Sequence, residues 1–338
     1  MRFFSLVSAL SVTLLIGCAH QNSTKTNLKT STAVASTNWE ERLQQARKQG
    51  PEAETFLGTE LFLKGNSAFM EGDYATGVEH FRHLVILTDE VFVHKKLAVA
   101  LIRMGELDES RIVLENLQKR GVKDEAIGLI LGGVYGAQDK NDLGRKAYQR
   151  VLAHNPQQED ACLFLGKMLI AEKKWKESET WLNKCQQQHP KEGTFSYYIG
   201  KMFIEKGDFK SAVKAFEDSH KRDPSSTQAA AALGVIYEQQ EKVGQALVVY
   251  YRHLKSSPKD EVILNRLVQA LFMLERFEEV IPYAEQLVDV EPDNLNMRVK
   301  LGILYTDAKE FDKAVSVFHE LLSLAPQSDK ILYYLGAI

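Results

Sequence analysis

Prolines recur at a constant interval along most of this chain. They stand 34 residues apart, at Pro156, Pro190, Pro224, Pro258, Pro292 and Pro326. A fixed period of this length indicates an array of repeated units, each of which packs mainly on its neighbours. At 338 residues, the chain is long enough to hold such an array together with additional segments.

A second pattern precedes five of the six prolines. Leu or Ile followed by Gly begins at 131, 165, 199, 233 and 301, and a large residue follows four positions later, at Tyr135, Leu169, Phe203, Tyr237 and Tyr305. Alanines at 212, 246 and 314 precede aromatic residues at 216, 250 and 318 by four. The pattern resembles the tetratricopeptide repeat, in which a small residue lets two helices approach and proline follows the second helix.

The resemblance implies an all-α fold, an α-solenoid of helical hairpins that forms a right-handed superhelix. We expect a helical segment at 39–57 and then eight repeats over 58–328. Their ranges are 58–90, 91–124, 125–158, 159–192, 193–226, 227–260, 261–294 and 295–328. Residues 329–338 read as the first helix of an incomplete ninth repeat, so we expect a chain truncated at its C-terminus. The alternative is that this last helix caps the array imperfectly. The seventh repeat departs from the pattern, with Val268 where Gly is expected.

The N-terminus has the pattern of a secretory signal. Met1 and Arg2 precede an apolar stretch from Phe3 to Ile16, which is too short to span a bilayer, and then Gly17 and Cys18. The ending resembles the lipobox of bacterial lipoproteins, in which the cysteine becomes N-terminal and is acylated. This implies a signal peptide at 1–17 and a lipid anchor on Cys18. The alternative is an ordinary signal peptide with an incidental cysteine.

The residues after Cys18 bear on location. By the same resemblance, Ala19 in place of Asp favours the outer membrane, with the protein on its periplasmic side. Residues 18–38 are rich in Ser, Thr and Asn and lack apolar periodicity, so we expect a flexible tether. The formal charge is −3, from 42 basic and 45 acidic side chains, which gives no basic footprint for nucleic acid.

No catalytic motif is present, so we expect a protein that is not an enzyme and has no cofactor. His80, His83 and His94 could form a metal site, but solvated helix histidines explain them equally well, and we expect no metal. Cys162 and Cys185 face each other across one expected hairpin. They form either a disulfide or two buried thiols, and we expect thiols, because packed helices usually lie 8–10 Å apart.

The resemblance also implies a concave groove, lined by the first helix of each repeat, that binds a protein partner. We place the groove site on Leu163, Phe164, Lys167, Tyr197, Tyr198 and Lys201. Lys201 is expected to lie over Tyr197, and the two lysines to bind an acidic or carboxylate-bearing segment. The alternative is that Tyr198 only packs between repeats and the lysines only solubilise the groove. No small-molecule substrate is evident.

We therefore expect a lipid-anchored scaffold or adaptor for an envelope complex. Similar lipoproteins take part in pilus assembly, barrel assembly, peptidoglycan hydrolysis or polysaccharide export. A different class of function stays open, in which the array is the substrate-binding arm of a larger enzyme such as a glycosyltransferase, whose remainder lies beyond residue 338.

Overall fold

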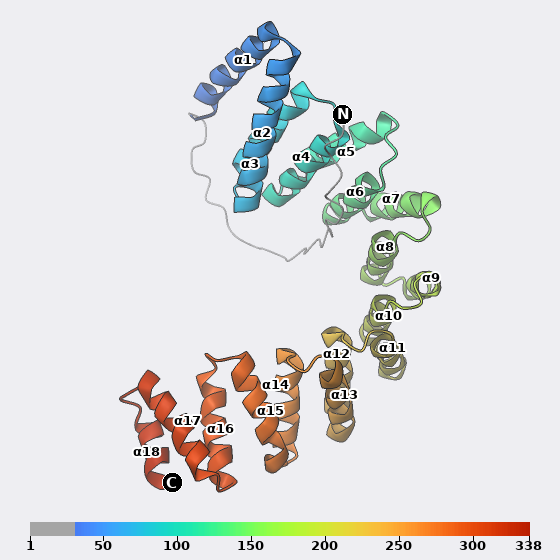
Figure 1. The fold of residues 1–338 in the computed structure, drawn as a ribbon. Coiled ribbons are helices and arrows are strands. Elements are labelled where there is room, and N and C mark those ends of the chain that lie inside the picture. The colour runs from blue at the N-terminus through green and yellow to red at the C-terminus, as the bar shows by residue number, and fades with distance from the viewer. Residues whose placement is uncertain (1–30) are drawn as a thin grey trace. The chain divides into compact units, whose positions relative to one another are not determined.

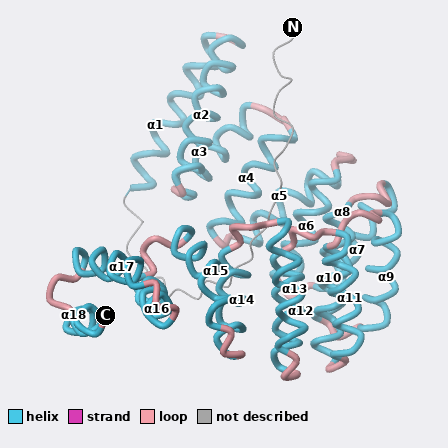
Figure 2. Tube along the Cα trace, turned by 60° about the horizontal axis from the view of Figure 1, so that its bottom comes forward, coloured by secondary structure: helices cyan, strands magenta, loops and turns pink. Residues whose placement is uncertain are grey.

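The computed structural model describes residues 31–338, with side chains described from residue 39 (Figure 1). Every regular element in this part of the chain is an α-helix, as the sequence predicts (Figure 2). The expected signal peptide, Cys18 and most of the expected tether lie outside the described residues. None of the described helices is long and apolar enough to cross a bilayer. The chain divides into two units between Val93 and His94, and we describe each by itself.

The first unit contains α1 (Ser31–Gln49), α2 (Pro51–Glu71) and α3 (Tyr74–Leu87). Helix α1 begins eight residues before the expected start at 39, so residues 31–38 of the expected tether are helical. Helix α2 begins at Pro51, where a residue without an amide proton costs no hydrogen bond. Trp39 of α1 stacks on His83 of α3, with ring centroids 4.1 Å apart.

The second unit is a succession of hairpins from which α18 extends. Its helices are α4 (Val91–Met104), α5 (Leu107–Lys119), α6 (Glu125–Ala137), α7 (Asn141–His154), α8 (Glu159–Ala171), α9 (Trp175–Gln188), α10 (Thr194–Lys206), α11 (Phe209–Arg222), α12 (Thr227–Gln239), α13 (Val243–Ser256), α14 (Glu261–Met273), α15 (Phe277–Val290), α16 (Leu295–Asp307), α17 (Phe311–Leu324) and α18 (Asp329–Ala337). Helix α4 begins just before the unit boundary. We number repeats 1–8 from the hairpin α2–α3 to the hairpin α16–α17, and call their helices A and B.

Small and large residues meet in each hairpin sixteen residues apart. The glycines of helix A face a large side chain of helix B, such as Phe216 opposite Gly200 and Tyr250 opposite Gly234. In the seventh repeat Val268 replaces the glycine, and the residue sixteen positions later is Ala284. Both are buried. The larger side chain in helix A is therefore matched by a smaller one in helix B, which accommodates the departure from the pattern.

The turn from helix A to helix B needs one residue in the left-handed region. Gly207 takes this position in repeat 5, with a φ of 80°. Five other repeats use Asp139, Lys173, Glu241, Glu275 and Lys309, with φ between 55° and 60°. The backbone of the turn is therefore the same in these repeats, although the side chain at this position differs.

A recurrent hydrogen bond joins some repeats. Tyr135, Tyr237 and Tyr305 of helix A each donate to a glutamate twenty residues earlier, in helix B of the preceding repeat. The acceptors are Glu115, Glu217 and Glu285, at 2.8, 3.0 and 2.5 Å. Burial and the bond to Glu115 raise the pKa of Tyr135 to about 12.

Candidate functional site

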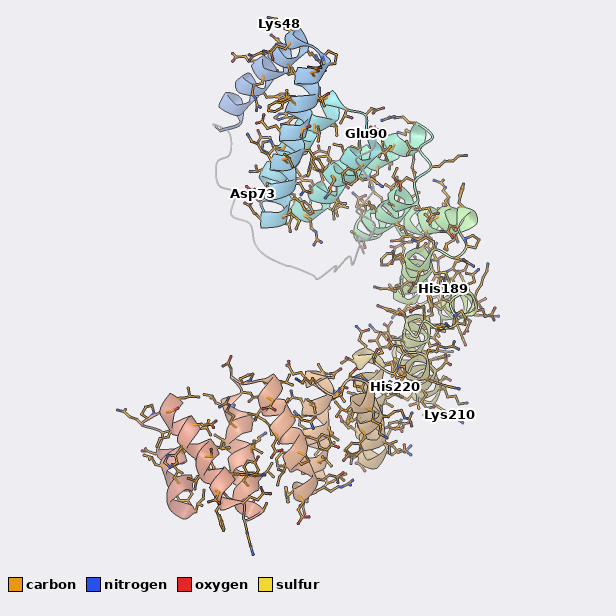
Figure 3. The ribbon with its side chains drawn as sticks, in the orientation of Figure 1. Lys48, Asp73, Glu90, His189, Lys210 and His220 are labelled. Carbon is orange, nitrogen blue, oxygen red and sulfur yellow. A yellow bond between two sulfur atoms is a disulfide. The ribbon has the colours of Figure 1, made fainter. Side chains whose placement is uncertain are left out.

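The six predicted groove residues lie on two neighbouring A helices, α8 and α10. Figure 3 shows the side chains on the ribbon, with His189 labelled at the end of α9, the helix that connects α8 to α10 along the chain. Leu163, Phe164 and Lys167 follow one another at helical spacing on α8. Tyr197, Tyr198 and Lys201 occupy the equivalent positions on α10. The side chain of Gln158 accepts from the amide of Ala161 and so caps the start of α8.

The structure brings both lysines to one aromatic ring. Lys167 Nζ lies 5.2 Å from the ring centroid of Tyr198, and Lys201 Nζ lies 5.7 Å from it. Lys167 also lies 5.7 Å from the ring centroid of Phe164. The expectation that Lys201 lies over Tyr197 differs from this arrangement, since a lysine side chain three residues after Tyr198 reaches that ring on the same helical face.

Tyr197 and Leu163 supply the apolar border of this site. Tyr197 meets Tyr198 edge to face, with ring centroids 5.4 Å apart, and lies 5.5 Å from Phe216 of α11. Both tyrosines are half-buried, and burial raises the pKa of Tyr197. Leu163 is half-buried against the core of repeat 4. The rings are therefore held in place by packing while one side stays accessible.

Both lysines are exposed, and neither makes an ion pair within residues 39–338. A ring face offers each ammonium group a weak attraction, but it does not neutralise the charge. Two cations beside one ring thus create a local positive potential. The arrangement is suited to binding a carboxylate, which accepts hydrogen bonds from ammonium groups.

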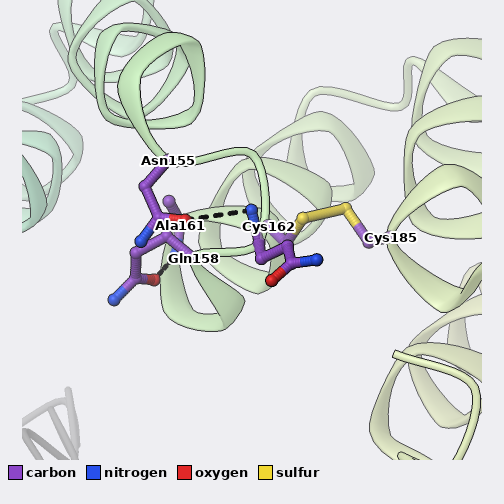
Figure 4. The surroundings of a disulfide bond; sticks show 6 residues. Asn155, Gln158, Ala161, Cys162 and Cys185 are labelled. Carbon is purple, nitrogen blue, oxygen red and sulfur yellow. Dashed lines mark hydrogen bonds between the residues drawn. A yellow bond between two sulfur atoms is a disulfide. The ribbon is translucent and has the colours of Figure 1, made fainter. Parts of the chain in front are cut away.

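A disulfide fixes α8 to α9 directly beneath these residues. Cys162 and Cys185 are joined, with Cα atoms 6.0 Å apart, and both are buried (Figure 4). The expectation of separate thiols is therefore wrong. Gly166 has no side chain to hold off Leu182, whose Cδ2 would lie 2.3 Å from an added Cβ, and this close approach brings the cysteines within bonding reach.

A buried polar network places α10 against α9, and sequence reasoning missed it. Gln186 Oε1 accepts from the amide and hydroxyl of Ser196, at 3.1 and 2.7 Å. Its Nε2 donates to the carbonyls of His189 and Glu192. The Ser196 hydroxyl also lies 2.6 Å from Oδ2 of Asp218 on α11, so its one proton is shared between Gln186 and Asp218. The helical period that places Leu182 and Cys185 inside could have indicated that Gln186 is buried too.

Thr, His and Asp side chains also meet between α13 and α14, where they stabilise the fold. His253 is fully buried and lies 2.8 Å from Asp260, which accepts from Thr227 and caps α14 through the amide of Ile263. Both carboxylate oxygens of Asp260 are thus engaged, one by Thr227 and His253 and the other by the cap of α14. Among the described residues, no three His, Cys, Asp or Glu side chains gather as a metal site would need.

Comparison with known proteins bears on the fold. A family model described as the tetratricopeptide repeat matches residues 131–192, 199–261 and 265–329, which together exceed half of the chain. The chain belongs to the tetratricopeptide repeat family. Proteins of this family mediate protein–protein interaction.

Individual relatives are distant. This tetratricopeptide repeat protein is 22% identical over 189 residues to anaphase-promoting complex subunit 3 of Schizosaccharomyces pombe, covering 56% of this chain and 28% of that protein. It is 25% identical over 121 residues to peroxisome biogenesis protein 5 of Arabidopsis thaliana, covering 36% and 16%. The chain spans less than a third of the length of these curated relatives.

Solved structures of similar chains include two from bacteria. PilF of Pseudomonas aeruginosa is 15% identical, with a TM-score of 0.41, over 63% of this chain and 97% of that chain. A tetratricopeptide repeat protein of Parabacteroides merdae is 14% identical, with a TM-score of 0.37, over 83% and 98%.

Proposed function

We propose that this tetratricopeptide repeat protein is a scaffold that binds a partner protein in the groove of repeats 4 and 5. The observation that carries the proposal is the position of Lys167 and Lys201 over the ring of Tyr198. Interface centres are enriched in aromatic residues, and polar and charged residues surround them at the rim. The bound segment is acidic or carries a free carboxylate, because only an anion relieves the repulsion between the two ammonium groups.

The proposal includes a location in the bacterial envelope. Cys18 is the lipid anchor, and the array lies on the periplasmic side of the outer membrane. Two observations support this independently of each other: the lipobox pattern that ends at Cys18, and the disulfide between Cys162 and Cys185. Disulfides persist in oxidising compartments such as the periplasm and are rare in the cytosol. The partner is then a component of an envelope assembly, such as a pilus, barrel, peptidoglycan or polysaccharide-export complex.

The groove is tested by reversing its charges. Partners are first identified by mass spectrometry after the full-length protein is purified from membranes. Lys167→Glu combined with Lys201→Glu is expected to weaken the partner's affinity at least about tenfold in low salt, and less in high salt, where charges are screened. Lys214→Glu combined with Lys221→Glu makes the same charge change at exposed positions of α11 and is the matched control.

The circular dichroism spectrum and melting temperature of each variant establish that folding is unchanged. If the groove variant binds the partner as tightly as the wild type and the control do at both salt concentrations, the site on α8 and α10 is wrong.

The anchor is tested at Cys18. In Cys18→Ala, the protein is expected to leave the membrane fraction or to accumulate as the uncleaved precursor, because two or three acyl chains account for its stable attachment. Labelled palmitate is expected to enter the wild type and not the variant. Incorporation into Cys18→Ala at the wild-type level would contradict the assignment of Cys18 as the acylated residue.

A further inference from the structure

Two hollows of similar size open at the turns of the second unit. One, of about 500 Å³, lies at the turn of repeat 4 and reaches Lys206 at the end of α10. The other, of about 520 Å³, lies at the turn of repeat 7 and reaches Asp307 at the end of α16. We call them the lysine hollow and the acidic hollow. Each is formed by the turn of one repeat and the end of helix A in the next.

The two hollows have opposite charges at equivalent positions of the repeat. Lys173 and Lys176 line the first, and Glu275 and Glu278 line the second, in each case 102 residues apart, which is three periods of 34. Lys173 and Glu275 have nearly the same backbone conformation, with φ of 57° and 55°. The backbone is therefore common to both hollows, and the side chains alone set the sign of the charge.

Most of these charges are available to a partner. In the lysine hollow, Lys174 is paired with Glu172 at 2.7 Å, whereas Lys173 and Lys176 have no ion pair in the described part of the chain. Glu177 and Glu179 also line this hollow and reduce its net charge without cancelling the four lysines.

In the acidic hollow, too, only some of the charges are paired, and the hollow keeps an excess of negative charge. Arg276 pairs with Glu279. Glu275, Glu278 and Asp307 have no ion pair in the array as described.

Aromatic and apolar side chains lie beside both sets of charges. Trp175 lines the lysine hollow and is half-buried. Phe277 lines the acidic hollow and is 45% exposed. An apolar centre with charges at its rim is the composition of a protein interface more than of a solvated turn.

We propose that the lysine hollow of one copy of this chain binds the acidic hollow of a second copy. Trp175 and Phe277 would form the apolar centre of the contact, with Lys173 and Lys176 opposite the carboxylates of Glu275 and Glu278. Because each copy carries both hollows, the contact is made twice if a two-fold axis relates the copies. If no such axis relates them, one hollow of each kind remains open and the copies continue into a chain.

The test exchanges the charges between equivalent positions. The first variant combines Lys173→Glu and Lys176→Glu, and the second combines Glu275→Lys and Glu278→Lys. The backbone accepts both, because the chain already has Glu and Lys at the equivalent turn positions. Full-length protein in nonionic detergent is examined by sedimentation over a range of concentrations at low salt. Lys214→Glu with Lys221→Glu is again the matched control.

Wild type and control are expected to associate as concentration rises. Each hollow variant alone is expected to associate at least about tenfold more weakly. In a mixture of the two variants, one variant carries two acidic hollows and the other carries two basic hollows, so association between the two is expected to recover. A chain carrying both sets of substitutions again has one hollow of each sign, and it is expected to associate with itself. Recovery of association in that combined chain distinguishes a direct contact from damage to either hollow.

Three results would overturn the proposal. The wild type could remain monomeric at all concentrations. It could associate with an affinity that neither variant changes. Association could also fail to recover in the chain that carries both sets of substitutions. Sedimentation with vesicles of phosphatidylcholine, with and without phosphatidylglycerol, is run in parallel. If the lysine hollow binds only the anionic vesicles while the protein stays monomeric, its occupant is a lipid surface and the proposal is wrong.

Discussion

Gly234→Ala is expected to lower the free energy of unfolding by about 2 kcal/mol, although alanine is normally the better helix former. A Cβ at this position would lie 2.0 Å from Oη and 2.2 Å from Cζ of Tyr250. Tyr250 is fully buried between α12 and α13 and has no free space to move into. The two helices must therefore separate or the ring must leave its rotamer. Urea unfolding followed by circular dichroism measures the change.

Gly136→Ala is the control for this prediction. Its nearest contact would be Met168 Cε at 3.9 Å, an ordinary van der Waals distance. The same substitution is therefore expected to stabilise α6 by up to about 1 kcal/mol. If both variants move the unfolding midpoint in the same direction, close helix packing is not the reason that glycine occupies position 234.

Breaking the disulfide is expected to cost about 3 kcal/mol of stability. Cys162 and Cys185 are 23 residues apart, and the bond limits the conformations of the unfolded chain over that segment. Reduction of the wild type, or Cys162→Ala combined with Cys185→Ala, is expected to lower the melting temperature. Reductant should then have no further effect on the double variant. Mass spectrometry of unreduced protein should show the two cysteine peptides linked.

If reductant leaves the melting temperature of the wild type unchanged and no linked peptides are found, the cysteines are free thiols. That result would also remove one of the two supports for an envelope location.

The architecture could be predicted from the sequence because the repeats share one pattern of residues that pack together. A small residue in helix A, a large residue sixteen positions later and a closing proline are local features that recur with the period. The reversed pair Val268 and Ala284 follows the same rule, and the sequence alone could have predicted it. The packing of α8 on α9 decided the disulfide, and the distance between two backbones at a glycine crossing is not visible as a sequence pattern.

The candidate site was predicted only in part. The period placed Lys167, Tyr198 and Lys201 on the correct helices, because position in the repeat determines the face. The ring that Lys201 contacts depends on the rotamers of long side chains. These rotamers cannot be read from the neighbouring residues in the sequence. Gln186 and Ser196 were missed because polar residues are usually read as exposed, whereas here each satisfies the other inside the array.

The tyrosine–glutamate bonds are present at some junctions between repeats and absent from others. They join repeats 2 and 3, 5 and 6, and 7 and 8. At the other three junctions within repeats 2–8, helix A has Leu169, Phe203 or Leu271 in place of tyrosine, and the residues twenty positions earlier are Gln149, Asn183 and Tyr251. Donor and acceptor are thus lost together.

Because each repeat depends mainly on its neighbours, local opening of the array is expected to concentrate at the junctions that lack this bond. The junction between repeats 4 and 5 also lacks it, but Gln186, Ser196 and Asp218 join α9, α10 and α11 there. It carries Lys167 on one side and Lys201 on the other, so a ligand that holds both lysines would span a boundary that buried polar contacts already fix. Little of the binding free energy would then be spent on ordering the repeats on either side, and the groove would be preorganised for its ligand.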